Sequence, residues 1–230
     1  MTQEKQWEKE YKDSKFITKH EAPQKFFIRF LKFLKKEKQI EIRGLKILDL
    51  GCGVGRHANY LASLGALVTG LEISKTALKI ARERAEREKL KVDYRLTDIG
   101  GQYDFSKNYF DLVLDITSSN ALNEKEREVY LGEVERVLRS GGYFFVRALC
   151  KEGDQNAKKM LKLFPGKEVD TYIMPGTNLV EKVFSREDFQ RFYSKKFEIL
   201  KLTKESGYSS FNNQSYKRNF WIAYMQKNNG

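Results

Sequence analysis

A glycine-rich turn follows an apolar segment in the stretch LDLGCGVGRH, residues 48–57. Gly51, Gly53 and Gly55 alternate with other residues there. Glycine permits positive φ and lacks a Cβ, so such a turn lets a ligand approach the backbone closely. The spacing GxGxG differs from the dinucleotide pattern GxGxxG, because Arg56 occupies the position of the third glycine. The phosphate-binding pattern GxxxxGK[ST] is also absent, so a phosphate is not the expected occupant of the turn.

Three acidic residues lie at the ends of successive apolar segments, as the glycine turn does. Glu72 ends the second apolar segment, about 20 residues past the first glycine, where a carboxylate accepts hydrogen bonds from both hydroxyls of a ribose. Asp49 lies just before the turn and is placed to meet a cationic or polar group, or to orient the turn amides. Asp98 ends the third apolar segment, where an adenine can lie alongside. The three acids predict a ligand with a ribose and an ammonium group rather than a pyrophosphate.

Apolar and amphipathic segments alternate strictly over the first two thirds of the chain. This alternation is typical of a doubly wound α/β sheet with parallel strands and right-handed crossovers. Helices are predicted between the strands, with Ser74 as one N-cap and Asn123 with Glu126 opening another helix over 124–139, which Gly141 and Gly142 end. The predicted strands are 45–50, 66–74, 92–98, 109–116 and 143–149.

The two ends of the chain break this rhythm. Residues 24–38 predict a basic amphipathic helix whose apolar stripe covers a sheet, a membrane surface being the less favoured alternative. After residue 150 we predict a helix over 154–164, an extended or hairpin segment over 171–184 and a short helix after Ser185. Two late strands, 197–206 and 218–227, are joined by a short loop and should pair antiparallel.

Composition narrows the function classes. The 230 residues suit one domain, and no apolar run is long enough to span a bilayer. The polar N-terminus lacks the apolar centre of a signal peptide, and Cys52 and Cys150 are expected to be free thiols, so a cytoplasmic monomer or dimer is predicted. Two histidines and two cysteines without metal-ligand spacing predict no metal site. The net charge of +12 is compatible with an anionic partner, although a lysine-rich proteome or solvated helix faces are the favoured explanation.

The motifs resemble a known family. LDLGCGVGRHANYLASLGALVTGLEIS, RLTDI, FDLVLD and EVERVLRSGGYFFV, within residues 40–150, resemble the core of class I S-adenosylmethionine-dependent methyltransferases. The resemblance implies a Rossmann-like sheet of seven strands, mostly parallel with the last strand antiparallel. GRHANYLASLG and the N-terminal WEKEY are most similar to the small-molecule enzymes, including tellurite-resistance and thiopurine methyltransferases. The resemblance also implies an N-terminal helical cap or lid (1–40) and one methyltransferase domain (41–230), with a cofactor half (41–150) and a substrate-side half (151–230).

The same resemblance implies roles for individual residues toward S-adenosylmethionine. Asp49 and the glycines of the turn would hold the methionine part, Glu72 the ribose and Asp98 the adenine amine. Asp115 would lie near the amino acid end and the methyl group. In the lid, Trp7, Tyr11 and Phe16 would make apolar contacts or would only cover the sheet edge. The remaining residues expected at the cofactor are Gly51, Gly53, Gly55, Arg56, Ile73, Ile99 and Tyr11.

The acceptor side is less patterned. The loop DITSSNALN after the fourth strand lacks the D/N-P-P-Y/F motif of nucleic-acid amino-methyltransferases, which argues against that chemistry. Methyl transfer from a sulfonium is an in-line displacement, so no catalytic triad is expected. Ser118, Ser119 and Asn120 either orient a polar substrate or cap a helix. His20 is a candidate base, Arg147 a candidate partner of an acidic substrate, and the other candidates are His57, Tyr208, Tyr216 and Arg218.

Three functions therefore remain open from the sequence. The favoured one is a methyltransferase acting on a small molecule. A second is an RNA or protein methyltransferase, for which the basic charge speaks. A third is a cofactor-binding protein without catalysis. The acceptor pocket, expected from residues 1–23, 117–121 and 150–216, decides between them.

Overall fold

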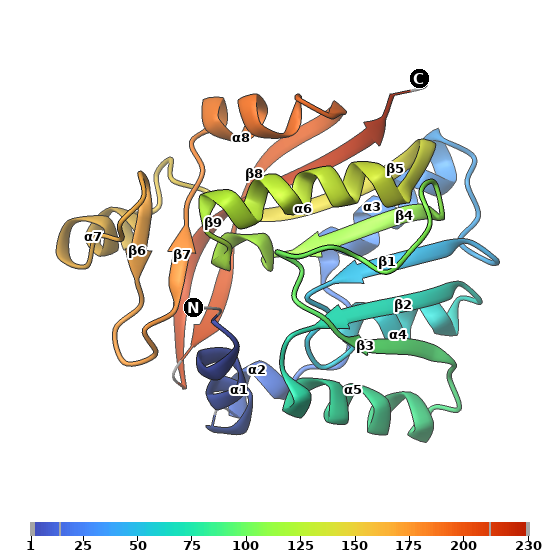
Figure 1. Ribbon diagram of the computed structural model, residues 1–230, viewed down its shortest axis with the longest axis horizontal. Helices are drawn as coiled ribbons and strands as arrows, with labels where there is room; N and C mark the ends of the chain where they lie inside the picture. Colours follow the sequence, from blue (N-terminus) through green and yellow to red (C-terminus); the bar gives the residue numbers. More distant parts are fainter. Residues whose placement is uncertain (1–2, 14, 212, 229–230) are drawn as a thin grey trace.

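A seven-stranded mixed sheet forms the centre of the computed structural model, which describes residues 3–13, 15–211 and 213–228. The strand order is β3-β2-β1-β4-β5-β9-β8 (Figure 1). Neighbouring strands from β3 to β5 are parallel, whereas β9 is antiparallel to both β5 and β8. The predicted fold, including the antiparallel last strand, is confirmed. The seven strands are β1 (Lys46–Leu50), β2 (Leu67–Glu72), β3 (Val92–Leu96), β4 (Phe110–Ile116), β5 (Leu138–Leu149), β8 (Phe197–Phe211) and β9 (Gln214–Lys227).

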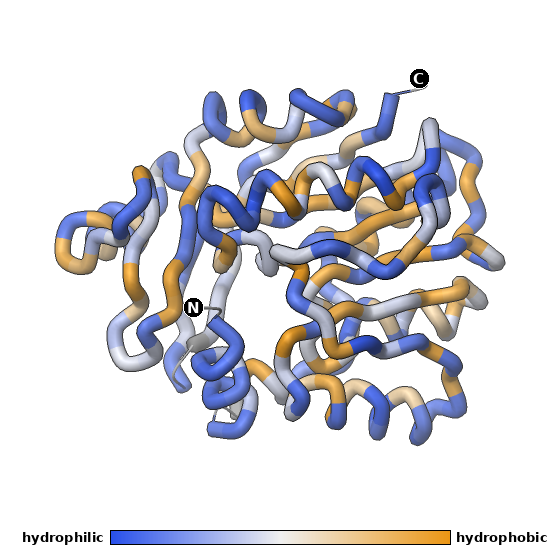
Figure 2. Tube along the Cα trace, viewed as in Figure 1, coloured by the Kyte–Doolittle hydropathy of each residue, from blue (hydrophilic) through white to orange (hydrophobic). Residues whose placement is uncertain are grey.

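Helices cover both faces of the sheet. One face buries the apolar sides of α3 (Lys25–Glu37), α4 (Arg56–Ser63) and α5 (Lys75–Arg87). The other face buries those of α6 (Glu124–Val137) and α8 (Arg186–Tyr193). Strands covered on both sides read as continuous apolar runs, as the hydropathy colouring of the central strands shows (Figure 2). The predicted role of residues 24–38 is thereby confirmed, since α3 packs its apolar stripe on the sheet: Phe27, Phe30, Leu31 and Leu34.

The helix starts follow the capping residues that the sequence predicts. Ser74 accepts a hydrogen bond from the Ala77 amide at 3.1 Å and so caps α5. Asn123 and Glu126 form a reciprocal capping box at the start of α6. Such caps contribute about 1 kcal/mol each. They matter here because α5 and α6 begin at the carboxyl ends of the strands, where ligands of this fold bind.

The late hairpin differs from the prediction of a short loop over 207–217. The strands continue through most of this segment, since β8 extends to Phe211 and β9 begins at Gln214. Glycine, serine and asparagine residues in the segment suggested a loop, yet cross-strand pairing overrides such local preferences. Asn213 has a φ of +55°, a conformation that asparagine tolerates in tight hairpin turns. The long hairpin brings residues near its tip close to the sheet's carboxyl edge.

The remaining elements surround that edge. The predicted hairpin over 171–184 is present as β6 (Thr171–Ile173) and β7 (Val180–Lys182), and the helix predicted over 154–164 as α7 (Gln155–Leu163). Helix α6 ends at Val137, and the glycine pair expected to stop it lies inside β5. At the other end of the chain, α1 (Glu4–Asp13) lies beyond the carboxyl ends of β1 and β2 (Figure 1). The short helices are α2 (Lys15–Thr18) and the 3-10 turn η1 (Ser119–Ala121). No helix among the described residues has both the length and the hydrophobicity needed to cross a bilayer.

Candidate active site

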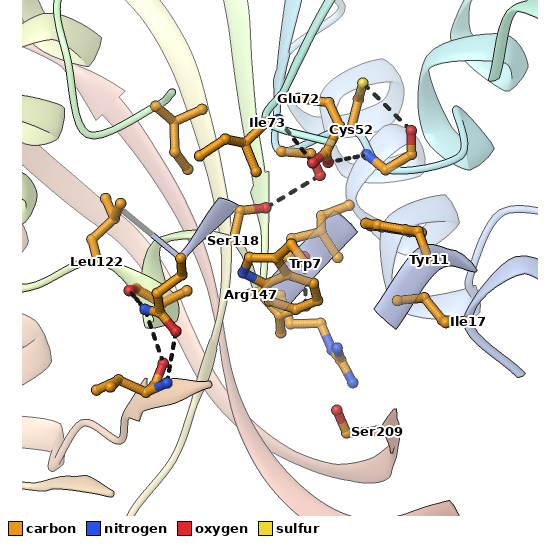
Figure 3. A pocket seen from close by; sticks show the side chains of 18 of the residues that line it. Trp7, Tyr11, Ile17, Cys52, Glu72, Ile73, Ser118, Leu122, Arg147 and Ser209 are labelled. Carbon is orange, nitrogen blue, oxygen red and sulfur yellow. Dashed lines mark hydrogen bonds between the residues drawn. The ribbon is translucent and has the colours of Figure 1, made fainter. Parts of the chain in front are cut away.

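A cavity of about 790 Å³ opens beyond the carboxyl ends of β1, β2, β4 and β5. Its walls come from the glycine turn, from the loops after β2, β3 and β4, and from Arg147 on β5. The N-terminal helix and the two hairpins complete the walls, with Trp7 and Tyr11 on one side and Ser209 on another (Figure 3). Doubly wound sheets bind their ligands at this edge. The structure therefore brings most of the predicted site residues together around one space.

The glycine turn is shaped by close neighbours. Gly51 and Gly53 have φ values of +63° and +54°, which favour glycine. A Cβ on Gly51 would lie 2.4 Å from the Ser118 hydroxyl oxygen, and one on Gly53 would lie 2.7 Å from the Tyr11 hydroxyl oxygen. Both residues line the cavity. Glycine at these two positions therefore keeps the backbone itself accessible as part of the cavity wall.

Gly55 has a different surrounding. It lies behind the cavity wall and precedes α4 with a φ of +77°. A Cβ there would lie 2.2 Å from the Tyr94 hydroxyl oxygen and 3.0 Å from the Ala81 side chain. The third glycine of the turn thus allows α4 to start close against α5 and β3, whereas the first two border the cavity.

We expect Gly55→Ala to lower the free energy of unfolding by roughly 2–4 kcal/mol, since it combines a strained φ with overpacking. Chemical denaturation measures this directly. Gly132→Ala is the matched control: Gly132 lies within α6 with nothing near its would-be Cβ, so the change should be neutral or slightly stabilising. A Gly55→Ala variant as stable as Gly132→Ala would contradict the packing role.

Asp49 is a buried acid with an unused oxygen. Its side chain is 2% exposed, and its Oδ2 has no hydrogen-bond partner among the described residues. Burial, together with the nearby carboxylates of Asp115 and Glu72, raises the pKa of Asp49 to about 8, against the opposing effect of a hydrogen bond from the Ala58 backbone. An unpaired buried acceptor is costly. A cationic donor in the cavity, such as an ammonium group, would satisfy it.

Glu72 is held by three backbone amides. Its Oε2 accepts from Gly53 at 2.9 Å, and its Oε1 accepts from Ile73 at 2.8 Å and Ser74 at 2.9 Å. Burial raises the pKa of Glu72, and the same amide hydrogen bonds act in the opposite direction. The carboxylate is thus fixed in orientation and still borders the cavity. This is the preorganisation that recognition of a ribose diol requires.

The third acid and its neighbours continue this wall. Asp98 lines the cavity, and its Oδ1 accepts a hydrogen bond from the Gly100 amide at 2.9 Å. Ile73 and Ile99 line the cavity on either side of the strand-end loops. A flat apolar group with an exocyclic amine would meet two isoleucine side chains and a carboxylate. The carboxylates and apolar side chains of this wall therefore fit adenosine together with an ammonium group. These are the groups that S-adenosylmethionine carries.

Two predicted residues lie behind the wall instead. Asp115 is fully buried and accepts hydrogen bonds from the Ser118 amide at 2.8 Å and the Tyr130 hydroxyl at 2.6 Å. Asn120 is buried in η1, where its Oδ1 accepts from the Leu149 amide at 3.2 Å. Both side chains shape the loop after β4. Ser118 does border the cavity, and its hydroxyl donates to the Leu50 carbonyl at 2.7 Å.

Cationic and imidazole side chains form the opposite part of the cavity. Arg56, His57, Arg147 and the exposed His20 all line it. Burial, together with the positive charges of Arg56 and Arg147, lowers the pKa of His57 to about 3. His57 is therefore neutral at physiological pH, and its Nε2 has no hydrogen-bond partner within the described part of the chain. Carboxylates, two arginines and a neutral imidazole thus line the same cavity.

The remaining candidates divide. Tyr208 lines the cavity, whereas Tyr216 donates to the Gln214 side chain at 2.7 Å. Arg218 is buried, 2.9 Å from Asp154 in an ion pair, and serves the packing of β9. The side chain of Phe16 lies outside the described part of the chain. Several lining residues were not predicted individually, although all but Thr97 lie in the ranges expected to form the acceptor pocket: Gln3, Ile17, Thr97, Lys167, Val180, Ser209 and Ser210. The described residues contain no group of three or more potential metal ligands.

Comparison with known proteins assigns the family. A family model described as a methyltransferase domain matches residues 47–142. An uncharacterized methyltransferase of Schizosaccharomyces pombe is 34% identical over 105 residues, which are 46% of this chain and 72% of that protein.

Solved structures share the fold. A methyltransferase dependent on S-adenosylmethionine from Methanosarcina mazei aligns with a TM-score of 0.73 and 22% identity, covering 91% of this chain and all of that one. The 1,6-didemethyltoxoflavin-N1-methyltransferase of Burkholderia thailandensis, crystallised with 1,6-didemethyltoxoflavin and S-adenosylhomocysteine, aligns with a TM-score of 0.70 and 15% identity over 98% of this chain and 87% of that one. The predicted resemblance is confirmed, and the chain belongs to the class I S-adenosylmethionine-dependent methyltransferases.

Proposed function

We propose that this chain transfers the methyl group of S-adenosylmethionine to a small-molecule acceptor. The observation that carries the proposal is the size of the cavity, whose walls include Gln3, Trp7 and Tyr11 of the N-terminal segment. A volume of about 790 Å³ falls in the range of metabolite-sized sites. A nucleic acid or a protein acceptor would require an open groove at this edge. The toxoflavin enzyme, whose fold is similar, holds a small acceptor beside its cofactor product.

The cofactor is assigned to the acidic wall. Asp49 and the amides of the glycine turn would hold the methionine part, with Arg56 available to its carboxylate. Glu72 would bind the ribose hydroxyls, and Asp98 the adenine amine. Gly55 and Asp115 would act indirectly, through the start of α4 and the loop after β4. The other residues assigned to the cofactor are Gly51, Gly53, Ile73, Ile99 and Tyr11.

Catalysis would depend on alignment and on exclusion of water. The bound cofactor supplies a methyl group on a sulfonium, whose leaving thioether needs no acid. The loop after β4, with Ser118, would orient the acceptor, because that loop borders the cavity next to the glycine turn. A base is needed only for an acceptor that arrives protonated. His20 is the candidate for it, since buried His57 remains neutral and packs edge-on against Phe27.

The N-terminal segment would act as the lid. Glu8 accepts hydrogen bonds from the Ser74 hydroxyl at 2.7 Å and from the Thr76 hydroxyl at 2.6 Å, at the first turn of α5. Burial acts to raise the pKa of Glu8, but the hydrogen bonds from Thr76 and Ser74 lower it to about 2. At the front of the segment, Gln3 accepts from the Val180 amide at 2.7 Å. We therefore assign the role of lid to the segment from Gln3 to α2. Helix α3 is excluded from the lid because it packs on the sheet.

Isotope transfer tests the acceptor class. Protein and methyl-labelled S-adenosylmethionine are incubated with two fractions of one bacterial extract: metabolites, and RNA with protein. We expect label only in the metabolite fraction, because a cavity of about 790 Å³ accommodates a small acceptor. A filter-binding titration at low salt should accordingly show no RNA binding. Label in the RNA or protein fraction, or RNA binding that falls steeply with salt, would favour a macromolecular acceptor. Cofactor binding without transfer to either fraction would favour a non-catalytic protein.

A further inference from the structure

We propose that the acceptor carries a carboxylate and that Arg147 receives it as a bidentate partner. This inference rests on the proposed function and deepens it by naming the chemical class of the acceptor. Arg147 lies near the carboxyl end of β5 and lines the cavity. Its side chain extends toward Ser209 of the β8–β9 hairpin (Figure 3). The position places an anion at the acceptor end of the cavity, away from the ribose-binding Glu72.

Arg147 is a buried cation without an anionic partner. Its side chain is 6% exposed, yet it makes no hydrogen bond or ion pair with any other residue that the structure describes. Glu205 is the carboxylate that raises the pKa of Arg147, and it is already paired with Arg29. A buried charge that lacks a partner is costly, and proteins keep one where a ligand supplies the opposite charge.

Aromatic rings fix the guanidinium. Its Cζ lies 3.3 Å from the centroid of the Phe220 ring and 4.8 Å from that of Phe26. At 3.3 Å a planar group lies against the ring face, so its N–H donors point outward around its rim. Gly207 leaves room beside this group, since a Cβ there would lie 3.5 Å from an Arg147 nitrogen. A stacked guanidinium with a free edge is preorganised for a carboxylate fork.

The electrostatics of the site agree with this geometry. Burial lowers the pKa of Arg147 to about 9, and the nearby Arg56 and Arg218 act in the same direction, against Glu205. The side chain therefore keeps its charge at neutral pH, and an incoming anion would stabilise it. One guanidinium fork matches one carboxylate in charge and shape. Apolar and aromatic residues of the same cavity would accommodate the rest of the acceptor: Trp7, Ile17, Ile116 and Tyr208.

The competing assignment is the carboxylate of the cofactor itself. Arg147 would then anchor the methionine part, and its loss would weaken the cofactor rather than the acceptor. The two assignments predict different behaviour of two probes, S-adenosylhomocysteine and methylthioadenosine, because only the first carries a carboxylate.

Calorimetric titration distinguishes them. Wild type, Arg147→Gln, Arg147→Lys and the control Arg191→Gln are compared, since Arg191 is an exposed arginine of α8 far from the cavity. Each is titrated with S-adenosylhomocysteine and with methylthioadenosine. Each is then saturated with S-adenosylhomocysteine and titrated with the matched pairs benzoate and benzamide, and phenylacetate and phenylacetamide.

We expect wild type and Arg191→Gln to prefer each acid over its amide by roughly 30-fold, the effect of a charge-assisted fork. Arg147→Gln should lose this preference, and Arg147→Lys most of it, because a point charge does not replace a stacked fork. Cofactor affinities should be unchanged in all variants. Equal binding of acid and amide to wild type, or a preference that survives in Arg147→Gln, would overturn the proposal. So would an Arg147→Gln protein that binds S-adenosylhomocysteine weakly but methylthioadenosine normally.

Failure of the proposed function itself has a separate signature. If wild type binds neither nucleoside, the cofactor assignment is wrong, whereas the acid–amide preference is still measured on the free protein. Both outcomes are read from the same titrations.

Discussion

Replacing Glu72 by glutamine should lower the affinity for S-adenosylhomocysteine about 100-fold. Each hydrogen bond from a ribose hydroxyl to a carboxylate contributes about 1.5–3 kcal/mol, and 1.4 kcal/mol corresponds to a factor of ten. Glutamine offers only one accepting oxygen, and its amide NH2 would face either the Gly53 donor or the donors of Ile73 and Ser74, depending on its orientation. The change therefore removes ribose recognition and disturbs the turn that presents it. Isothermal titration measures the affinity.

The matched control is Glu83→Gln on the exposed face of α5, which changes the net charge by the same amount. Its affinity should equal that of wild type. Circular dichroism establishes that both variants are folded. If folded Glu72→Gln binds S-adenosylhomocysteine within about threefold of wild type, the ribose assignment is wrong, since the loss of two charge-assisted bonds cannot be so small.

Replacing Asp49 by asparagine should stabilise the free protein and weaken cofactor binding at the same time. The pKa of Asp49 is raised from 3.8 to about 8, so the folded state holds a proton that the unfolded state releases above pH 4. The stability contributed by this group is present below pH 4 and is lost as the pH rises toward 8. Asparagine keeps an oxygen for the Ala58 amide and does not titrate. At pH 8 the variant should gain about 1–3 kcal/mol.

Cofactor binding should respond in the opposite sense. An ammonium group pairs with ionised Asp49, so the affinity of wild type for S-adenosylhomocysteine should rise as the pH approaches 8. In Asp49→Asn the affinity should be at least about tenfold lower and should lose this rise. Denaturation and titration between pH 6 and 9 measure both effects. Asp93→Asn, a substitution of an exposed acid on β3, is the control. A variant that is less stable than wild type at pH 8 would contradict the role given to Asp49.

Much of the fold was predictable because its signals are local. The apolar runs of the five parallel strands and the caps at Ser74 and Asn123 depend on neighbouring residues only. The doubly wound topology then places every strand's carboxyl end at one edge. Asp49, Glu72 and Asp98 were expected to line one cavity on this argument, and they do. Their roles toward the cofactor remain predictions that the two substitutions above examine.

The parts that sequence reasoning missed depend on long-range contacts. Gln3 accepts a hydrogen bond from the backbone of Val180, 177 positions later in the chain, and no local sequence pattern predicts such a contact. The β8–β9 strands were predicted, but their continuation through residues 207–217 was predicted as a loop, because the glycine and serine residues there disfavour strands in isolation. Asp115 was expected near the cofactor, and Asn120 was expected either to orient a substrate or to cap a helix; both side chains are buried in the packing of β4 and η1. The isolation of Arg147 likewise became visible only when its neighbours were known.

The two sides of the cavity come from different kinds of sequence. Its acidic side derives from one compact stretch, residues 49–99, built on the sheet itself. Its other side is assembled from the N-terminal segment, the loop after β4 and two hairpins, which the chain contributes in separate pieces. Insertions and deletions in hairpins and terminal segments leave a sheet intact. The architecture is therefore modular in evolution: descendants of one ancestor can acquire new acceptors by remodelling the peripheral pieces while they inherit the cofactor side unchanged.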